Sequence, residues 1–199
     1  MATLIVELKV MAQQVSRMSS GPFDSSRAPN DGTRLDLGSL RIPSAPELEV
    51  SVEFDQDSMT PLSVSMILPH SIISLQAFAS PTHEDTWPEV RDDVVAELAK
   101  HGIDTDVVLG KFGTEIHTVM PSQEADGQTV ITPVRFIGVD GDRWFLRIVV
   151  SGSGAVDEIA GEEVDSLIGD LVVHRGQEPM GPGEPLPIVL PEGSGTSDD

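Results

Sequence analysis

Three arginines that could bind an anion lie close together between Pro133 and Gly152. They are Arg135, Arg143 and Arg147. A guanidinium binds carboxylate or phosphate oxygens through two parallel hydrogen bonds, a geometry that lysine does not offer. In a chain with 33 acidic and 12 basic residues, this local concentration of arginine calls for an explanation. We therefore take the three arginines as candidate residues for binding a ligand or a protein partner.

The same segment has the pattern of a β-hairpin. Asp140-Gly141 favours a turn, and the flanking residues are rich in β-branched and aromatic types. A two-residue loop at Asp140-Gly141 would place Arg135 on the most apolar face. A three-residue loop, residues 140–142, separates the residue types better, and we adopt it. The apolar face would then carry Val134, Phe136, Trp144, Leu146 and Ile148. The opposite face would carry Arg135, Ile137, Arg143, Phe145 and Arg147.

This register would place Arg135 directly opposite Arg147, and like charges in that position are unfavourable. The preferred explanation is that nearby Asp or Glu side chains neutralise them, which a chain with 33 acidic residues makes easy. The alternative is a small anion, or a carboxylate of a partner protein, held between the two guanidinium groups. Either explanation keeps the arginines on one surface.

The other motifs give no catalytic constellation. The 5 histidines are dispersed, and no two have the helical spacing of a zinc pair. His83-Glu84-Asp85 comes closest to a metal-binding cluster, and we expect it only to precede a helix. Gly152-Ser153-Gly154 lacks the lysine of a phosphate-binding loop, so a flexible turn is the simpler interpretation. With 0 cysteines, thiolate chemistry is excluded. We predict no catalytic residue, no metal site and no cofactor.

Charge and composition restrict the partners. A formal net charge of −21 repels nucleic acid and anionic lipid, and it favours solubility or a basic protein partner. No segment approaches the roughly 20 apolar residues of a membrane helix. The apolar segment Thr3–Val10 lacks the basic region and the cleavage site of a signal peptide. We expect a cytoplasmic protein that binds neither nucleic acid nor membrane.

Periodicity predicts the elements that would position these residues. Strands are expected at Leu48–Phe54, Leu62–Leu68, Ser71–Phe78, Val107–Leu109, Glu115–Met120, in the hairpin, and at Leu171–His174. A first helix should begin with the capping-box pattern Thr86-Trp87-Pro88-Glu89 and end near His101-Gly102. A second should cover Val156–Asp170. This order predicts an α+β fold, with a curved, mainly antiparallel sheet of about six strands and both helices on one face.

The chain is expected to divide into three parts. Residues 1–33 form an N-terminal segment and a flexible linker, and residues 1–20 fit either a strand or a short helix. Residues 34–176 form a single α+β domain. Residues 177–199 form a proline-rich arm and a disordered acidic tail. Within the arm, Leu186–Pro191 could add to a sheet edge of its own chain or of a partner.

Several short motifs occur in a fixed order along the chain. They are Gly21–Asp24, Arg34–Leu40 with Ile42-Pro43, Leu75–Ala79, Phe112–Glu115, Pro133–Phe136, Asp140-Gly141, Arg143-Trp144, Arg175-Gly176, Pro179-Met180 and Leu186-Pro187. In this order they resemble DUF3710, a family of uncharacterised actinobacterial proteins, over residues 21–191. The function of that family is unknown, so the resemblance implies no activity, cofactor or catalytic residue.

Two functional hypotheses remain. The first is a non-enzymatic protein-interaction or regulatory module that meets its partner through the arginine face or the proline-rich arm. The alternative is a small-anion-binding protein, or an enzyme, that uses Arg135, Arg143 and Arg147. The alternative requires a pocket with convergent polar groups beside these arginines.

Overall fold

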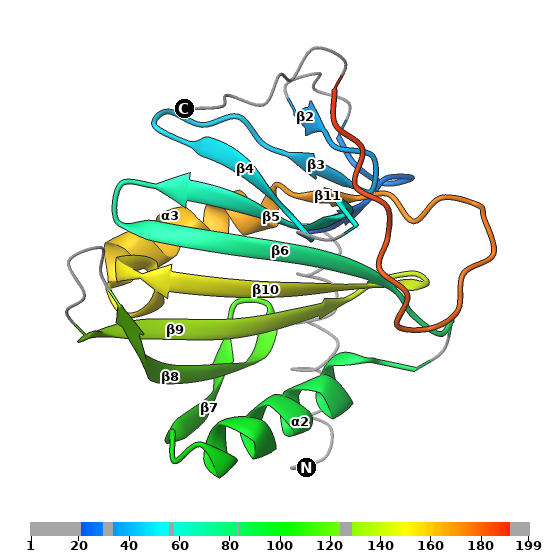
Figure 1. Cartoon of the computed structure of the whole chain (residues 1–199). Helices are drawn as coiled ribbons and strands as arrows, with labels where there is room; N and C mark the ends of the chain where they lie inside the picture. Colours follow the sequence, from blue (N-terminus) through cyan, green and yellow to red (C-terminus); the bar gives the residue numbers. More distant parts are fainter. Residues whose placement is uncertain (1–20, 30–33, 56–57, 83, 124–128, 192–199) are drawn as a thin grey trace, which may run out of the picture.

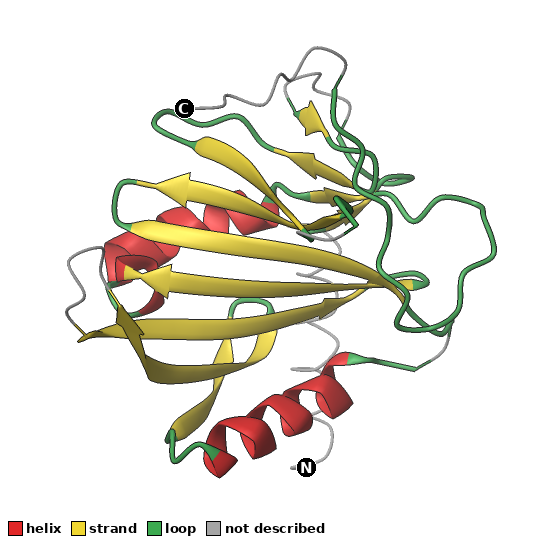
Figure 2. Ribbon diagram, in the orientation of Figure 1, coloured by secondary structure: helices red, strands yellow, loops and turns green. Residues whose placement is uncertain are grey.

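A computed structural model describes residues 21–29, 34–55, 58–82, 84–123 and 129–191. Two sheets form its body: a seven-stranded sheet in the order β4-β5-β6-β10-β9-β8-β7 and a four-stranded sheet in the order β1-β11-β3-β2. Two α-helices, α2 and α3, accompany them (Figures 1 and 2). The predicted α+β class is confirmed.

The larger sheet is antiparallel throughout. Its strands are β4 (Glu49–Phe54), β5 (Pro61–Leu68), β6 (Ser71–Ala79), β10 (Trp144–Gly152), β9 (Thr129–Asp140), β8 (Gly113–Gln123) and β7 (Thr105–Gly110). Every strand that the sequence predicted between Leu48 and the hairpin appears here with longer or slightly shifted ends. Alternating and β-branched residues are therefore enough to locate these strands.

The smaller sheet contains a strand that the local pattern did not predict. Its strands are β1 (Phe23–Asp24), β2 (Leu35–Asp36), β3 (Leu40–Ile42) and β11 (Val172–Val173). β1 lies in a segment for which the sequence predicts a loop, and it pairs in parallel with β11. Its partner lies almost 150 residues away, so only the tertiary fold creates this strand.

The pairing of β9 with β10 differs from the predicted hairpin. Ile137 faces Ile148, and Arg135 faces Val150. The turn is therefore Asp142-Arg143, closed by a 2.8 Å bond from the Gly141 N–H to the Trp144 carbonyl. The three-residue loop at 140–142 is wrong, and Arg135 does not face Arg147. The prediction failed because it kept Arg135 away from the apolar residues, whereas the fold places it among them.

The two helices lie on opposite faces of the larger sheet, not on one face as predicted (Figure 1). α3 (Glu158–Gly169) and the smaller sheet cover one face through the core that includes Leu146 and Ile148. We call this the packed face. α2 (Trp87–Lys100) covers part of the opposite face, where Trp87 packs near Ile116 and Phe145. We call this the α2 face. The central strands are apolar on both sides, so each side requires a cover.

The proline-rich arm lies extended on its own chain. The Leu186 N–H donates to the Ala77 carbonyl at 2.8 Å, and the Val189 N–H donates to the Leu37 carbonyl at 3.0 Å. Leu186 is 4% exposed and belongs to the main core. The arm thus links the end of β6 to the smaller sheet, as the red segment of Figure 1 shows. The sequence left open whether Leu186–Pro191 would add to a sheet edge of its own chain or of a partner. In the structure, the segment pairs with its own chain.

Candidate functional site

The structure separates the three arginines that the sequence analysis placed on one face. Arg135 lies on the packed face and is 7% exposed. Arg147, half-buried, lies on the α2 face, and Arg143 is exposed in the turn with a φ of 61°. The three guanidinium groups therefore do not converge on one anion. Alternation along the two strands decides this, because the observed register puts residues 135 and 147 on opposite sides.

Carboxylates neutralise Arg135 inside the fold. Its Nε donates to Glu115 Oε2 at 3.1 Å, its Nη2 to Asp165 Oδ1 at 3.0 Å, and its Nη1 to the Gly154 carbonyl at 3.2 Å. Glu115, on β8, is 1% exposed, and Asp165 belongs to α3. The expected neutralisation by nearby acidic residues is met here. The cluster ties α3 to β8 and β9, and every nitrogen of the guanidinium donates within the fold.

His117 and Gly110 complete the surroundings of Glu115. The Nε2 atom of His117 lies 3.3 Å from Glu115 Oε2. The other oxygen, Oε1, is buried and has no hydrogen-bond partner among the described residues. Gly110 packs directly on this carboxylate, and any Cβ at that position would collide with it. Close packing around Glu115 thus favours a structural role for the cluster.

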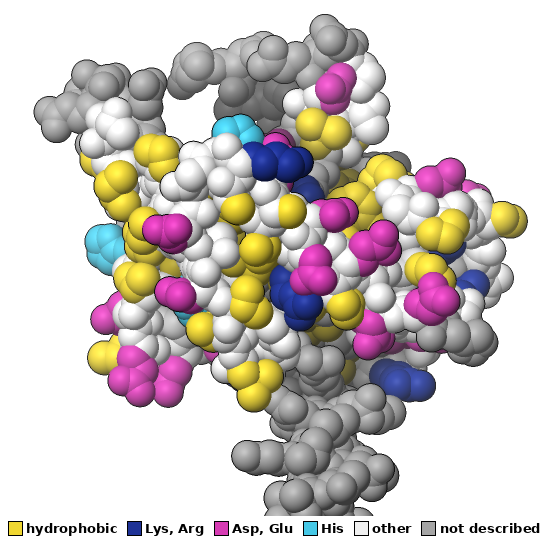
Figure 3. Space-filling view, turned by 90° about the horizontal axis from the view of Figure 1, so that it is seen from below, with side chains coloured by type: hydrophobic (Ala, Val, Ile, Leu, Met, Phe, Trp, Pro, Cys, Tyr) yellow, Lys and Arg dark blue, Asp and Glu magenta, His cyan; other side chains and the backbone are white. Residues whose placement is uncertain are grey.

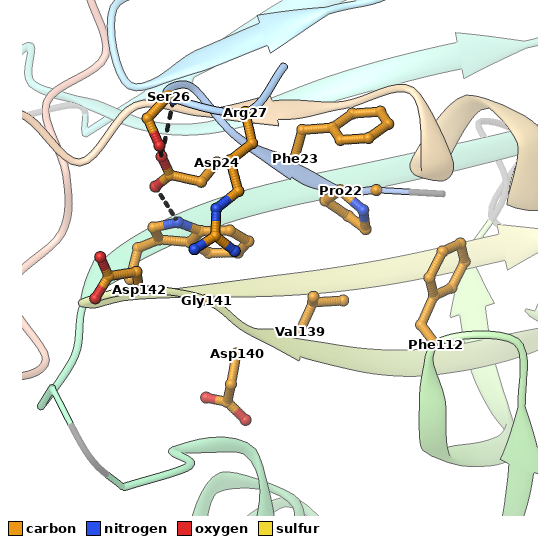
Figure 4. A pocket seen from close by; sticks show the side chains of 12 residues that line it. Pro22, Phe23, Asp24, Ser26, Arg27, Phe112, Val139, Asp140, Gly141 and Asp142 are labelled. Carbon is orange, nitrogen blue, oxygen red and sulfur yellow. Dashed lines mark hydrogen bonds between the residues drawn. The ribbon is translucent and has the colours of Figure 1, made fainter. Parts of the chain in front are cut away.

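A cavity of about 150 Å³ opens elsewhere, where three distant segments of the chain meet. Its apolar lining consists of Pro22, Phe23, Phe112, Val139 and Trp144 (Figure 4). These side chains come from the start of the described chain, from the turn between β7 and β8, and from the β9–β10 hairpin. An apolar cavity of this size holds a group as large as benzene.

The polar part of the lining is mostly acidic. Asp24, Asp140 and Asp142 are among the lining residues, but the Asp140 carboxylate points away from the cavity toward the start of α2 (Figure 4). Among the described lining residues, Arg27 is the one cation. Ser26 is the other polar side chain in Figure 4. The cavity therefore combines an apolar interior with a net negative lining.

Hydrogen bonds fix Asp24 beside Trp144. Asp24 accepts from the Ser26 N–H at 2.9 Å, from the Ser26 hydroxyl at 2.6 Å, and from Trp144 Nε1 at 3.0 Å. Partial burial acts to raise the pKa of Asp24, but these hydrogen bonds and the charge of Arg27 outweigh it, so the pKa lies below its usual range. The carboxylate therefore stays ionised at neutral pH and holds the indole in place.

Asp140 connects the cavity to the start of α2. Its carboxylate accepts from the Thr86 N–H at 2.8 Å and from the Trp87 N–H at 3.1 Å. The predicted helix start at Thr86 is confirmed, but the Thr86 side chain makes no capping bond. The expected capping box is therefore wrong: a carboxylate from β9 caps the helix instead. A cap supplied from another element cannot be recognised from residues 86–89 alone.

Sequence reasoning missed the cavity because its residues lie far apart in the chain. One signal was available: Gly21–Asp24, Phe112–Glu115 and the Asp140–Trp144 region all belong to the motifs that carry the family resemblance, and all three contribute to the lining. Of the triplet His83-Glu84-Asp85, which the sequence analysis expected only to precede a helix, Glu84 and Asp85 do not line the cavity. His83 lies outside the described residues. Within the described ranges, no group of three His, Asp or Glu side chains could hold a metal ion.

Comparison with known proteins adds a family but no activity. A family model described as a protein of unknown function, DUF3710, matches residues 21–196. No curated protein matches the chain. A crystal structure from Bacteroides thetaiotaomicron VPI-5482 is similar, with 12% identity and a TM-score of 0.39 over 70% of this chain and 47% of that chain. So distant a likeness carries no argument. Among the described residues, no helix is long and apolar enough to cross a membrane.

Proposed function

We propose that this chain, which belongs to the DUF3710 family of proteins of unknown function, is a protein-interaction module. Its cavity takes one apolar side chain from a basic segment of a partner protein. The observation that carries this proposal is the combination of an apolar cavity of about 150 Å³ with an excess of acidic over basic residues in its lining. An apolar anchor inserted in a pocket is the usual centre of a protein–protein interface.

The charge of the molecule supports a basic partner. The formal net charge is −21, and Figure 3 shows acidic side chains spread among apolar ones over one face, with few basic groups between them. Such a surface attracts a cationic segment and raises its association rate. At the cavity, Asp24 and Asp142 outnumber Arg27, and the Asp140 carboxylate is directed to the start of α2. A Lys- or Arg-rich segment with a central apolar residue is complementary to this arrangement.

The cavity is also preorganised, which lowers the cost of ordering on binding. Trp144 is held by its bond to Asp24, and Asp140 is held by the start of α2. Of the three candidate arginines, Arg143 is the one exposed beside this cavity, next to Asp142. We assign it to the rim of the interface, where it can meet a carboxylate of the partner.

Labelled peptides test this proposal. We would titrate the protein into fluorescein-labelled peptides that have Lys and Arg flanks around a central Leu, Phe or Trp, and follow fluorescence polarisation. Matched peptides would carry a central Ser, or Glu in place of the basic flanks. We expect saturable binding only when the apolar centre and the basic flanks occur together. Equal binding of all peptides, or no saturable binding at all, would refute the proposal.

Two variants and one reporter locate the binding. Asp142→Lys should weaken peptide binding at least about tenfold, because it reverses a charge in the lining. Glu162→Lys makes the same charge change at an exposed position of α3 and should leave binding unchanged. The chain has 2 tryptophans, so the NMR spectrum offers two indole N–H signals. Bound peptide should shift the Trp144 signal, assigned with Trp144→Phe, and leave the Trp87 signal in place.

A further inference from the structure

Arg147 is a half-buried cation without a carboxylate partner among the described residues. One Nη2 hydrogen bond goes to the amide oxygen of Gln76, and the guanidinium carbon lies 5.7 Å from the centre of the Phe78 ring. Across the described ranges, no carboxylate lies within salt-bridge distance of this guanidinium. Burial lowers the pKa of Arg147. A guanidinium has five N–H donors, and one hydrogen bond from Arg147 to a described residue uses only part of this capacity.

The acidic residues nearest in the sheet are committed elsewhere. On the adjacent strand, Gly138 faces Arg147 and offers no side chain. Asp140, two residues further, accepts the N–H groups at the start of α2. Glu53 lies in the same cross-strand row but three strands away, about 14 Å at the usual strand spacing. Its carboxylate accepts from the Ser63 hydroxyl at 2.6 Å.

An unpaired charge that is partly removed from water is costly, and proteins usually pair such groups. This chain has 33 acidic residues and has placed two of them against Arg135 on the neighbouring strand. Within the part of the chain that the structure describes, the lack of a carboxylate at Arg147 is therefore a specific feature of this position. An anion from outside the chain would supply the missing partner.

Polar and aromatic residues lie on the same face of the sheet as Arg147. By register, Ser74 and Ser65 lie side by side on β6 and β5, and Ser74 faces Val149 of β10. Ser65 is 6% exposed, and its hydroxyl has no partner among the described residues. Phe78 supplies a ring beside the guanidinium. Figure 1 shows α2 at the β7 end of the sheet. Its first residue, Trp87, packs over Gly138 beside Arg147, and neither helix lies over β5 and β6 on this face.

We propose that Arg147 anchors a binding site for a small organic oxyanion, a carboxylate or a phosphate monoester, on this open half of the α2 face. The guanidinium fork binds the two oxygens. The amide oxygen of Gln76 holds the guanidinium in place. The Phe78 ring contacts an apolar or aromatic part of the ligand. The hydroxyl of Ser65 forms a hydrogen bond with a polar group of the ligand. The site is separate from the cavity at Trp144.

Thermal unfolding with three probes tests this proposal. Phenyl phosphate, benzoate and inorganic phosphate would each be titrated into the wild type, Arg147→Gln and Arg41→Gln. Arg41→Gln removes the same charge from an exposed pair with Asp36 on the smaller sheet. We expect a saturable rise in Tm with phenyl phosphate or benzoate for the wild type and for Arg41→Gln, and its loss in Arg147→Gln. Arg147→Lys should weaken binding at least about tenfold, because lysine lacks the fork.

The free protein gives the second readout. If Arg147 serves to bind a ligand and does not stabilise the fold, the Tm of Arg147→Gln without added anion should be no lower than that of the wild type. A clearly lower Tm would make Arg147 a structural residue and overturn the proposal. An equal rise in all variants would indicate only the general effect of anions on burial and would also overturn it. So would the absence of saturation in the wild type. Whether phenyl phosphate or benzoate binds more tightly then identifies the oxyanion.

Discussion

Arg135 and Arg147 lie on neighbouring strands of one hairpin and have opposite environments. Arg135 is on the packed face, where Glu115 and Asp165 neutralise it at 3.0 Å. Arg147 is on the α2 face, where an amide and an aromatic ring are its contacts. The first arginine completes the core and the second is left with unused donors. The comparison teaches that the groups around a buried charge, more than burial itself, distinguish a structural residue from a candidate binding residue.

The largest expected effect comes from Arg135→Gln. Removing this cation leaves two carboxylates close together, one of them fully buried, so unfolding free energy should fall by about 3–5 kcal/mol. Arg147→Gln should not lower the unfolding free energy, because removal of an unpaired, partly buried charge offsets the loss of one net hydrogen bond. Urea denaturation of both variants measures the difference. Equal losses of unfolding free energy in the two variants would contradict the different roles assigned to Arg135 and Arg147.

Trp144→Ala tests which face of the hairpin is the core. Trp144 is 2% exposed and shares the packed face with Leu146 and Ile148. Its truncation should lower the unfolding free energy by about 3–5 kcal/mol, the usual range for a buried aromatic residue replaced by alanine. Trp144→Phe keeps most of the packing and loses the bond to Asp24, so its loss should be clearly smaller. A loss below about 1 kcal/mol for Trp144→Ala would contradict the assignment of the packed face.

The smallest effect should be a change in the acid limb of the pH–stability profile. The folded pKa of Asp24 lies below its ordinary value, so its ionised form stabilises the fold above the unfolded pKa of about 3.9. That stability should be lost as pH falls from about 5 through the lower, folded pKa. Asp24→Asn should therefore show a shallower loss of stability with acid. Urea midpoints measured between about pH 6 and 2 compare the two proteins, and identical slopes would contradict the role assigned to Asp24.

Local sequence patterns were sufficient for most of the elements. Alternation located β4 to β6, and Pro88 with the periodic valines located α2. They failed where a distant residue acts. β1 exists because β11 pairs with it, and α2 is capped by Asp140 of β9. Neither partner can be recognised within a few residues of the element that depends on it.

The hairpin shows the same limit for the candidate site. Separating residues by polarity favoured a register with all three arginines on one face. The observed register buries Arg135, because Glu115 and Asp165 come to it from β8 and α3. A rule that keeps charges away from apolar residues fails when another element supplies the opposite charge. The cavity could not be anticipated for a similar reason, since Phe23, Phe112 and Trp144 meet only in the folded chain.

The sequence by itself determined the α+β class, the positions of the principal strands and helices, the acidic surface and the family. These depend on composition and on periodicities within a few residues. The tertiary structure alone decided the hairpin register, the placement of the helices on opposite faces, the separation of the arginines and the formation of the cavity. Each of these depends on the packing and charge of groups that are distant in the chain, which no local pattern records.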